Sequence, residues 1–375
     1  MLGDSSQLDV GWRAAAMLAA MMPALLVALR LLFRDVESQA CRWLAAFQIA
    51  TVLSMTPQVI GFANFYDVWP GLSFLPVNMT LLLGPVLYLH GYRLMRGGAL
   101  GWRALLLIPG ALQLAYYAWA FYFLGDSLID YQRKWAFAER IHQPYVVPIE
   151  TSLAVGLMLF AVIALIRQLR SYQRFLQRTQ SANDTFRPLW LPRLFYGLGA
   201  AGLIWAVMAV VDTFVSPISY VGAYPVLLTL MALVSWFGLE AAIHIHEPFP
   251  KIQDEPTPQP ESEARNWADE GERIRERIQA ERWFLEPRLA VSDLSRRLGS
   301  NESYVSRALN QGLNRSFSAL INQLRVGHAQ ARLATTADSV LSVALESGFN
   351  SKATFNRVFR EIAGLTPTAY RAQSQ

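Results

Sequence analysis

The sequence predicts an all-α protein: a seven-helix transmembrane bundle followed by a small, all-helical unit with two helix-turn-helix motifs. Three observations support this fold class. Residues 12–245 contain seven long apolar stretches, residues 246–264 are rich in proline and acidic side chains, and residues 282–375 are basic and carry a repeated helix–glycine–helix pattern. Only 16% of the 375 residues are charged and the mean hydropathy is +0.24, whereas about a quarter of the residues are charged in soluble domains.

Each of the seven stretches is long enough to cross the hydrocarbon core of a bilayer, which takes about 20 apolar residues in a helix. Seven buried helices of a large soluble protein are the alternative. Stretches with so few charges, however, have no polar face to present to water. The expected spans are residues 12–33, 43–65, 70–92, 102–124, 145–167, 190–213 and 219–244.

The basic residues between the spans predict the orientation of the bundle. Twelve arginines accompany the connections after the first, third and fifth spans, and only four Lys or Arg residues lie on the opposite side. Because cytoplasmic loops carry the excess of Lys and Arg, these connections are expected to face the cytoplasm. The N-terminus is then outside, and an odd number of spans places the C-terminus inside.

Polar side chains within the spans mark candidate functional positions, because burying them in a bilayer is costly. By the predicted topology, two carboxylates lie toward the outer face, close to the aromatic outer end of the fourth span. They could line an outward-facing pocket for an effector. The alternative is a set of interfacial side chains that reach water beside an ordinary aromatic belt. The candidate sensor residues are Gln113, Tyr116, Tyr117, Trp119, Glu150 and Asp212.

Neither a catalytic centre nor a metal site is predicted. Cys41 is the only cysteine, so an intrachain disulfide and a thiolate zinc site are excluded. His244 and His246 are two residues apart and would point to opposite sides of a helix. No serine elbow, glycine-rich phosphate loop or HExxH motif occurs in the sequence. We therefore expect no catalytic residue, no metal and no cofactor.

Residues 246–266 are predicted to be a cytoplasmic tether. Five prolines between residues 248 and 260 prevent a continuous helix. The low hydrophobicity and acidic charge of this segment favour an extended, solvated chain. Residues 1–245 are therefore expected to form the membrane domain, and residues 267–375 a separate C-terminal domain.

The C-terminal domain contains two related segments, VSDLSRRLGSNESYVSRAL at residues 291–309 and VLSVALESGFNSKATFNRVF at residues 340–359. Each predicts a short helix, a glycine turn and a second helix, which is the pattern of a helix-turn-helix motif. The turn residues Gly299 and Gly348 are 49 positions apart. Residues 282–375 also hold 12 Lys and Arg against 6 Asp and Glu, a balance that favours a nucleic-acid partner.

Further matching positions reinforce the repeat. Asn301 and Asn350 are expected to open the second helices, because an asparagine side chain can cap free helix amides. Asn314 and Gly364, each seven residues after a matching arginine, are suited to the left-handed conformation that ends a helix. With these features, residues 275–375 resemble the DNA-binding domain of the AraC/XylS family. The most specific portion comprises ALESGF at 344–349, FNRVFR at 355–360 and GLTPTAYR at 364–371.

The resemblance implies two helix-turn-helix units joined by one long helix, here about residues 317–334, with both recognition helices in successive major grooves of double-stranded DNA. Solvated helix faces are the alternative for each polar position, and a buried or phosphate-pairing role is open for the two arginines. Tyr304, Val305, Leu309, Phe355, Val358 and Phe359 are expected to pack inward. The base-facing candidates are Ser303, Ser306, Arg307, Ser351, Lys352, Thr354, Asn356 and Arg357.

The function implied by this resemblance is that of a membrane-bound, one-component transcription regulator, not an enzyme. We expect it in a bacterial inner membrane, with the lipid bilayer, double-stranded DNA and an unknown small-molecule or membrane effector as partners. A homodimer is compatible with this interpretation. The alternatives are a transporter or intramembrane enzyme fused to a regulator, and a membrane-anchored factor released by proteolysis of the tether.

Overall fold

The computed structural model describes residues 11–124, 132–179, 190–245, 248–252 and 266–374. These residues form α-, 3₁₀- and π-helices and no β-strand, which confirms the all-α prediction. The chain divides into two compact units. The apolar unit comprises Met1–Leu169 and Leu189–Lys251, and the C-terminal unit comprises Arg170–Pro188 and Ile252–Gln375.

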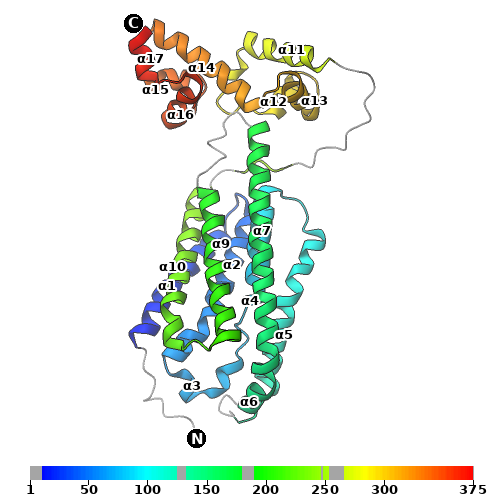
Figure 1. Ribbon diagram of the computed structural model, residues 1–375, viewed down its shortest axis with the longest axis vertical. Helices are drawn as coiled ribbons and strands as arrows, with labels where there is room; N and C mark the ends of the chain where they lie inside the picture. The colour runs from blue at the N-terminus through cyan, green and yellow to red at the C-terminus, as the bar shows by residue number, and fades with distance from the viewer. Residues whose placement is uncertain (1–10, 125–131, 180–189, 246–247, 253–265, 375) are drawn as a thin grey trace. The chain divides into compact units, whose positions relative to one another are not determined.

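The apolar unit is a bundle of long helices whose axes run roughly parallel or antiparallel to one another (Figure 1). Large apolar side chains lie on its surface, among them Leu26, Ile204 and Trp236, which are 50–65% exposed. Such a surface suits lipid and not water. The long helices are α1 (Trp12–Leu32), α2 (Ser38–Phe62), α4 (Thr80–Met95), α5 (Ile108–Phe123), α7 (Val147–Thr179), α9 (Trp190–Val210) and α10 (Tyr220–His244). The short ones are α3 (Phe65–Val68), η2 (Pro70–Phe74), η3 (Gly101–Leu107), α6 (Gln132–Phe137), η4 (Ala138–Val146) and η5 (Val211–Val215).

Six helical segments among the described residues are long and apolar enough to cross a membrane, not seven. The predicted span at residues 70–92 is interrupted: η2 ends at Phe74 and α4 begins at Thr80. Pro76 lies in the gap, where it lacks an amide hydrogen and disfavours a helical conformation in the preceding residue. The 16 residues of α4 rise about 24 Å, less than the ~30 Å hydrocarbon core.

The amides at the start of α4 find partners on neighbouring helices. The amide of Met79 donates to Ser54 Oγ of α2 at 3.0 Å, and that of Leu81 donates to Gln113 Oε1 of α5 at 3.1 Å. Without such partners, free amides in an apolar interior would each cost several kcal/mol. The break in the predicted third span is therefore supported by side chains of two other helices.

Prolines inside the long helices do not end them. Pro23, Pro57, Pro85 and Pro225 lie within α1, α2, α4 and α10, and each helix continues past its proline. In such a helix the carbonyl four residues before the proline lacks its usual amide donor, a loss that a membrane helix tolerates when it packs against neighbouring helices.

The first described part of the predicted tether packs against the bundle. The Phe249 amide donates to Glu37 Oε1 at 2.8 Å, and the Phe249 ring is buried. Lys251 forms an ion pair with Glu37 and donates to the carbonyl of Leu94 at 3.0 Å, near the end of α4. A cation at a helix C-terminus is electrostatically favourable. Residues 246–247 and 253–265, the rest of the predicted tether up to Asn266, lie outside the described residues.

The C-terminal unit consists of short helices around two apolar cores. One core contains Ile278, Leu294 and Leu309, and the other contains Val343 and Phe355. The long helix α14 contributes to both cores and confirms the predicted connecting helix at residues 317–334. The helices are α11 (Trp267–Ala280), η6 (Trp283–Leu285), α12 (Val291–Arg297), α13 (Glu302–Arg307), η7 (Ala308–Gly312), α14 (Phe317–Thr335), α15 (Val340–Glu346), α16 (Lys352–Ala363) and α17 (Pro367–Ser374).

The two glycine turns adopt the expected left-handed conformation, with φ of 62° at Gly299 and 84° at Gly348. A Cβ atom at Gly348 would also lie 2.7 Å from the carbonyl oxygen of Leu285. Asn314 and Gly364 have φ of 50° and 74°, as predicted for residues that end a helix. These positions are therefore restricted by backbone conformation, and Gly348 by space as well.

One of the two predicted caps is wrong. The Asn301 side chain accepts from the Tyr304 amide at 2.7 Å and caps α13 as expected. In the second unit, Ser351 and not Asn350 caps α16, because its Oγ accepts from the Thr354 amide at 3.2 Å. Ser351 lies three residues before the amide it satisfies, which is the spacing an N-cap side chain requires.

Arg325 of α14 connects the two cores. It is 1% exposed, and its guanidinium donates to the carbonyls of Phe284 at 2.7 Å and Glu286 at 2.6 Å. The guanidinium carbon also lies 5.8 Å from the centre of the Phe349 ring in the second core. Burial lowers the pKa of Arg325 to about 10, so the side chain stays charged at neutral pH.

We expect the substitution Arg325→Met to lower the free energy of unfolding of a 266–375 fragment by about 2–4 kcal/mol, because two buried carbonyls lose their donors. Urea unfolding followed by far-UV circular dichroism measures this change. Arg273→Ala is the matched control: it breaks an exposed ion pair with Glu270 and should cost at most about 0.5 kcal/mol. Equal midpoints for Arg325→Met and the unsubstituted fragment would contradict the prediction.

Candidate functional sites: a buried polar cluster and a nucleic-acid interface

A cluster of polar side chains surrounds Glu150 inside the apolar unit. The Glu150 carboxylate accepts from Asn78 Nδ2 at 2.7 Å and from the Tyr117 hydroxyl at 3.2 Å. It also accepts from the Thr80 hydroxyl at 3.3 Å and from the side-chain amide of Gln113. Four donors from α4, α5 and the segment before α4 therefore converge on one carboxylate of α7. We call these five residues the Glu150 cluster.

The position of Glu150 follows from the break before α4. Thr80 is the first residue of α4, and the Asn78 side chain accepts from the Thr80 amide at 3.2 Å. A helix N-terminus carries a partial positive charge that favours a nearby anion, with a typical gain of about 0.3–2 kcal/mol. The carboxylate is thus placed where backbone dipoles and side-chain donors both favour negative charge.

The structure brings some of the predicted sensor residues together and separates others. Glu150, Gln113 and Tyr117 belong to the Glu150 cluster, and the neighbouring Tyr116 hydroxyl lies 2.9 Å from His142 Nδ1. Asp212 is exposed in η5, directly after α9, where its Oδ1 accepts from the Ile218 amide at 2.7 Å. Trp119 is 46% exposed and contacts Tyr116 outside the cluster.

A cavity of about 410 Å³ lies beside the Glu150 cluster. Tyr117 and Asp212, both predicted sensor residues, line its wall, and side chains of α2, α4, α5, α9 and α10 complete it. The predicted sensor set lacks further polar lining residues. Two of them, Asn78 and Thr80, lie at the break after Pro76, which was predicted to be part of a continuous span. These additional residues are Ser54, Gln58, Asn78, Thr80 and His142.

In the C-terminal unit, α13 presents the first group of predicted base-facing residues. Ser303, Ser306 and Arg307 are half-buried and lie three and four positions apart, so they share one side of the helix. Ser306 Oγ accepts from the Asn310 side chain at 3.1 Å. Val305 and Leu309 are buried, as predicted.

In α16 the predicted residues have two different local roles. Lys352, Asn356 and Arg357 are exposed, and Arg357 pairs with Glu361 one turn later at 2.9 Å. Ser351 and Thr354 are instead joined at the helix N-terminus, with 3.0 Å between their hydroxyl oxygens. The apolar residues predicted to pack inward, Phe355, Val358 and Phe359, form part of the second core.

Comparison with known proteins places these helices in a recognised type of domain. A family model described as a helix-turn-helix domain matches residues 294–373. An uncharacterised HTH-type transcriptional regulator of Staphylococcus aureus (strain MSSA476) is 35% identical over 83 residues, which are 22% of this chain and 11% of the relative. The melibiose operon regulatory protein of Escherichia coli (strain K12) is 29% identical over 87 residues, 23% of this chain and 29% of the relative.

Residues 294–373 form an AraC-type helix-turn-helix domain. Among solved structures, the C-terminal domain of AraT, a response regulator from Geobacillus stearothermophilus, is 26% identical, with a TM-score of 0.26, and the match covers 28% of this chain and 84% of that one. The similarity spans about a tenth of the length of the staphylococcal relatives. It therefore concerns the AraC-type domain and not the apolar unit.

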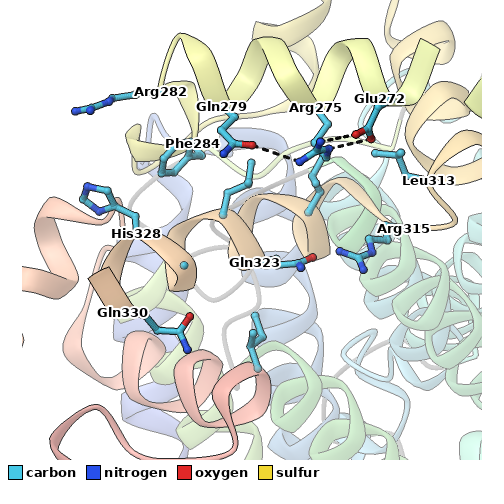
Figure 2. A pocket seen from close by; sticks show the side chains of 14 residues that line it. Glu272, Arg275, Gln279, Arg282, Phe284, Leu313, Arg315, Gln323, His328 and Gln330 are labelled. Carbon is cyan, nitrogen blue, oxygen red and sulfur yellow. Dashed lines mark hydrogen bonds and ion pairs between the residues drawn. The ribbon is translucent and has the colours of Figure 1, made fainter. Parts of the chain in front are cut away.

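The AraC-type domain and α11 also border a groove of about 930 Å³ (Figure 2). Arg282, Arg315 and His328 line the groove, as does Arg275, which forms an ion pair with Glu272. Burial, together with nearby arginines, lowers the pKa of His328. The eight predicted base-facing residues are absent from the described lining of this groove, so it is a surface separate from the candidate DNA interface.

Two substitutions at Ser351 separate its capping role from a contact with DNA. Ser351→Ala should destabilise a 266–375 fragment by about 1 kcal/mol, because the Thr354 amide loses its acceptor. Ser351→Asp should retain stability, since aspartate also caps helices, yet should weaken DNA binding because a carboxylate repels phosphate. Urea unfolding and fluorescence anisotropy measure the two effects. A fragment that loses neither stability nor affinity on either change would contradict this assignment.

Proposed function

We propose that this chain is a membrane-bound, one-component transcription regulator that senses a signal in its apolar unit and binds promoter DNA through its AraC-type domain. The observation that carries the proposal is the presence of six membrane-length apolar helices and an AraC-type domain in one chain. The relatives of the domain are named as an HTH-type transcriptional regulator and an operon regulatory protein. No group of metal-ligating residues occurs among the described residues.

For DNA recognition, we propose that α13 and α16 are the two recognition helices. The connecting helix α14 has 19 residues and rises about 28 Å, which is close to the ~34 Å of one DNA turn. Arg307 and Arg357 can donate to guanine, Asn356 can pair with adenine, and Lys352 can contact phosphate. The proposed set also retains Ser303, Ser306, Ser351 and Thr354.

We expect Arg357→Ala to reduce affinity for a selected genomic DNA fragment about 10- to 100-fold, because an arginine–guanine contact is worth about 1–3 kcal/mol. Fluorescence anisotropy at fixed salt, with a random-sequence fragment alongside, measures the change and its specificity. Glu361→Gln should instead strengthen binding, because it releases Arg357 from its ion pair and removes a charge that repels phosphate. Arg273→Ala on α11 is the matched control, and a loss of affinity equal to that of Arg357→Ala would argue against the proposed contact.

For the membrane topology, we propose seven crossings, with the N-terminus outside and the AraC-type domain in the cytoplasm. The twelve-to-four distribution of basic residues supports this orientation. Although α4 is short, η2 and the capped segment before it extend the crossing within the protein, where non-helical backbone is tolerated. An odd number of crossings leaves the two chain ends on opposite sides.

For coupling, we propose that movement of α10 carries the signal toward the AraC-type domain. Ala223 and Leu227 of α10 line the cavity beside the Glu150 cluster, on either side of Pro225. At the other end of α10, the contacts of Phe249 and Lys251 with Glu37 hold the start of the tether. A signal that moves α10 must therefore rearrange or transmit through this contact.

The experiment that tests the function is genome-wide mapping of crosslinked DNA with the full chain, combined with membrane sedimentation of the same cells. We expect the intact chain to sediment with membranes and to occupy a small set of promoters. A full chain carrying Arg307→Ala and Arg357→Ala should sediment equally but lose those promoters. Intact protein in the soluble fraction, or identical DNA profiles for both proteins, would refute the proposal. DNA occupancy by a released C-terminal fragment alone would instead support proteolytic release.

A further inference from the structure

We propose that the cavity beside the Glu150 cluster binds a small, apolar amine that enters from the outer side of the membrane. This inference rests on the proposed sensor function and specifies its ligand class. The cavity combines an apolar wall, the carboxylate of Asp212 and a buried acceptor that has no hydrogen-bond partner among the described residues. Together these features select a hydrogen-bond donor that carries positive charge.

The size and wall of the cavity suit a small organic molecule. Its volume of about 410 Å³ lies within the ~300–1,000 Å³ range of ligand pockets. Leu83, Trp205, Met208 and Leu227 contribute apolar or aromatic surface from three helices. An apolar body of roughly one aromatic ring and a short alkyl chain would therefore bury most of its surface here.

Two acceptors on the wall are available to a ligand donor. Gln58 Oε1 is buried, and among the described residues it has no hydrogen-bond partner. An unsatisfied buried acceptor costs about 1–3 kcal/mol, which a ligand N–H would recover. Asp212 uses Oδ1 to accept from the Ile218 amide and has a second carboxylate oxygen for an ammonium group.

The charges around the cavity favour a cation over an anion. Among the described lining residues, Asp212 is negative and none is Lys or Arg. Glu150 lies one side chain behind the wall, bonded to Asn78 and Tyr117, which line the cavity. The nearby ammonium of Lys134 donates to the Gly71 carbonyl at 2.9 Å and does not line the cavity. The two carboxylates attract an ammonium group and repel a carboxylate, and this effect is stronger for Glu150, which is less exposed than Asp212.

An occupant of this cavity would contact the helix that leads toward the tether. Met208 of α9 and Leu227 of α10 face the same space, and Leu227 lies two residues after Pro225. A proline inside a helix is a natural position for bending. An amine that separates α9 from α10 at this level would therefore change the course of α10, and only such differential contact can shift a conformational equilibrium.

Binding can be tested with three probes of similar shape and different charge: 2-phenylethylamine, 2-phenylethanol and 3-phenylpropionate. The full chain in lipid nanodiscs is titrated with each probe, and binding is followed by calorimetry and by the thermal unfolding midpoint. We expect saturable binding and thermal stabilisation with the amine, weaker binding with the alcohol and none with the carboxylate. Asp212→Asn should lower the affinity for the amine about tenfold or more, because one charge-assisted bond is lost.

Asparagine at position 212 retains an acceptor for the Ile218 amide, so this variant removes the charge with little structural change. Gln58→Leu is the second variant and should also weaken amine binding. Asp35→Asn is the matched control, because Asp35 is exposed in the connection between α1 and α2 and does not line the cavity. Equal affinity for the three probes, or an unchanged amine affinity in Asp212→Asn, would overturn the proposed ligand class.

The outcomes for this ligand and for the regulatory function are distinguishable. A chain that occupies promoters from the membrane but binds none of the probes refutes the amine site alone. A chain that binds the amine through Asp212 yet occupies no promoter refutes the regulator and retains the site. Amine binding that alters promoter occupancy by the unsubstituted chain, but not by Asp212→Asn, supports both.

Discussion

The apolar unit depends on one constraint. A backbone N–H that has no hydrogen-bond partner within its own helix must find another acceptor when it lies in an apolar interior. The chain meets this constraint at the start of α4, where Ser54 and Gln113 accept from Met79 and Leu81. Those acceptors come from α2 and α5. The break before α4 therefore requires polar side chains at the facing positions of these two neighbouring helices. The Glu150 cluster forms at the same place, because the N-terminus of a helix favours a nearby carboxylate.

This arrangement gives the interior of the bundle a polar centre around Glu150. Four side-chain donors satisfy Glu150, and no contact with Lys or Arg is among its described interactions. The cavity beside it has acceptors left over, at Gln58 and Asp212. A fully satisfied polar network is rigid, whereas a partly satisfied one is open to a ligand. The apolar unit contains a satisfied network in the Glu150 cluster and a partly satisfied one at Gln58 and Asp212.

The C-terminal unit is held together by the opposite distribution of polar and apolar groups. Its apolar side chains face inward in two cores, and a buried arginine satisfies carbonyls between them. Because α14 takes part in both cores, the two helix-turn-helix units are connected by packed side chains and not by a flexible loop. A rigid connection is what recognition of two successive major grooves requires.

Much of the candidate DNA interface could be predicted because its signals are local. Glycine turns, left-handed helix ends and inward-facing apolar positions each depend on a few neighbouring residues, and Gly299, Gly348, Asn314 and Gly364 adopt the expected conformations. Such signals have a limit: Ser351 caps α16 in place of the expected Asn350. Adjacent residues of similar chemistry can both serve as a cap, and the sequence does not distinguish between them. The ion pair between Arg357 and Glu361 was also not predicted from the sequence, since it depends on the conformation of both side chains.

The sequence by itself determined the class of each half: long uncharged stretches cannot be solvated as helices in water, and a repeated helix–glycine–helix pattern has few other interpretations. Only the tertiary structure decided where the third predicted span breaks, which donors surround Glu150, and that Phe249 and Lys251 pack against the bundle. Those features join residues far apart in the chain, and their energies depend on distance and burial. Hydropathy and spacing along the chain report neither quantity.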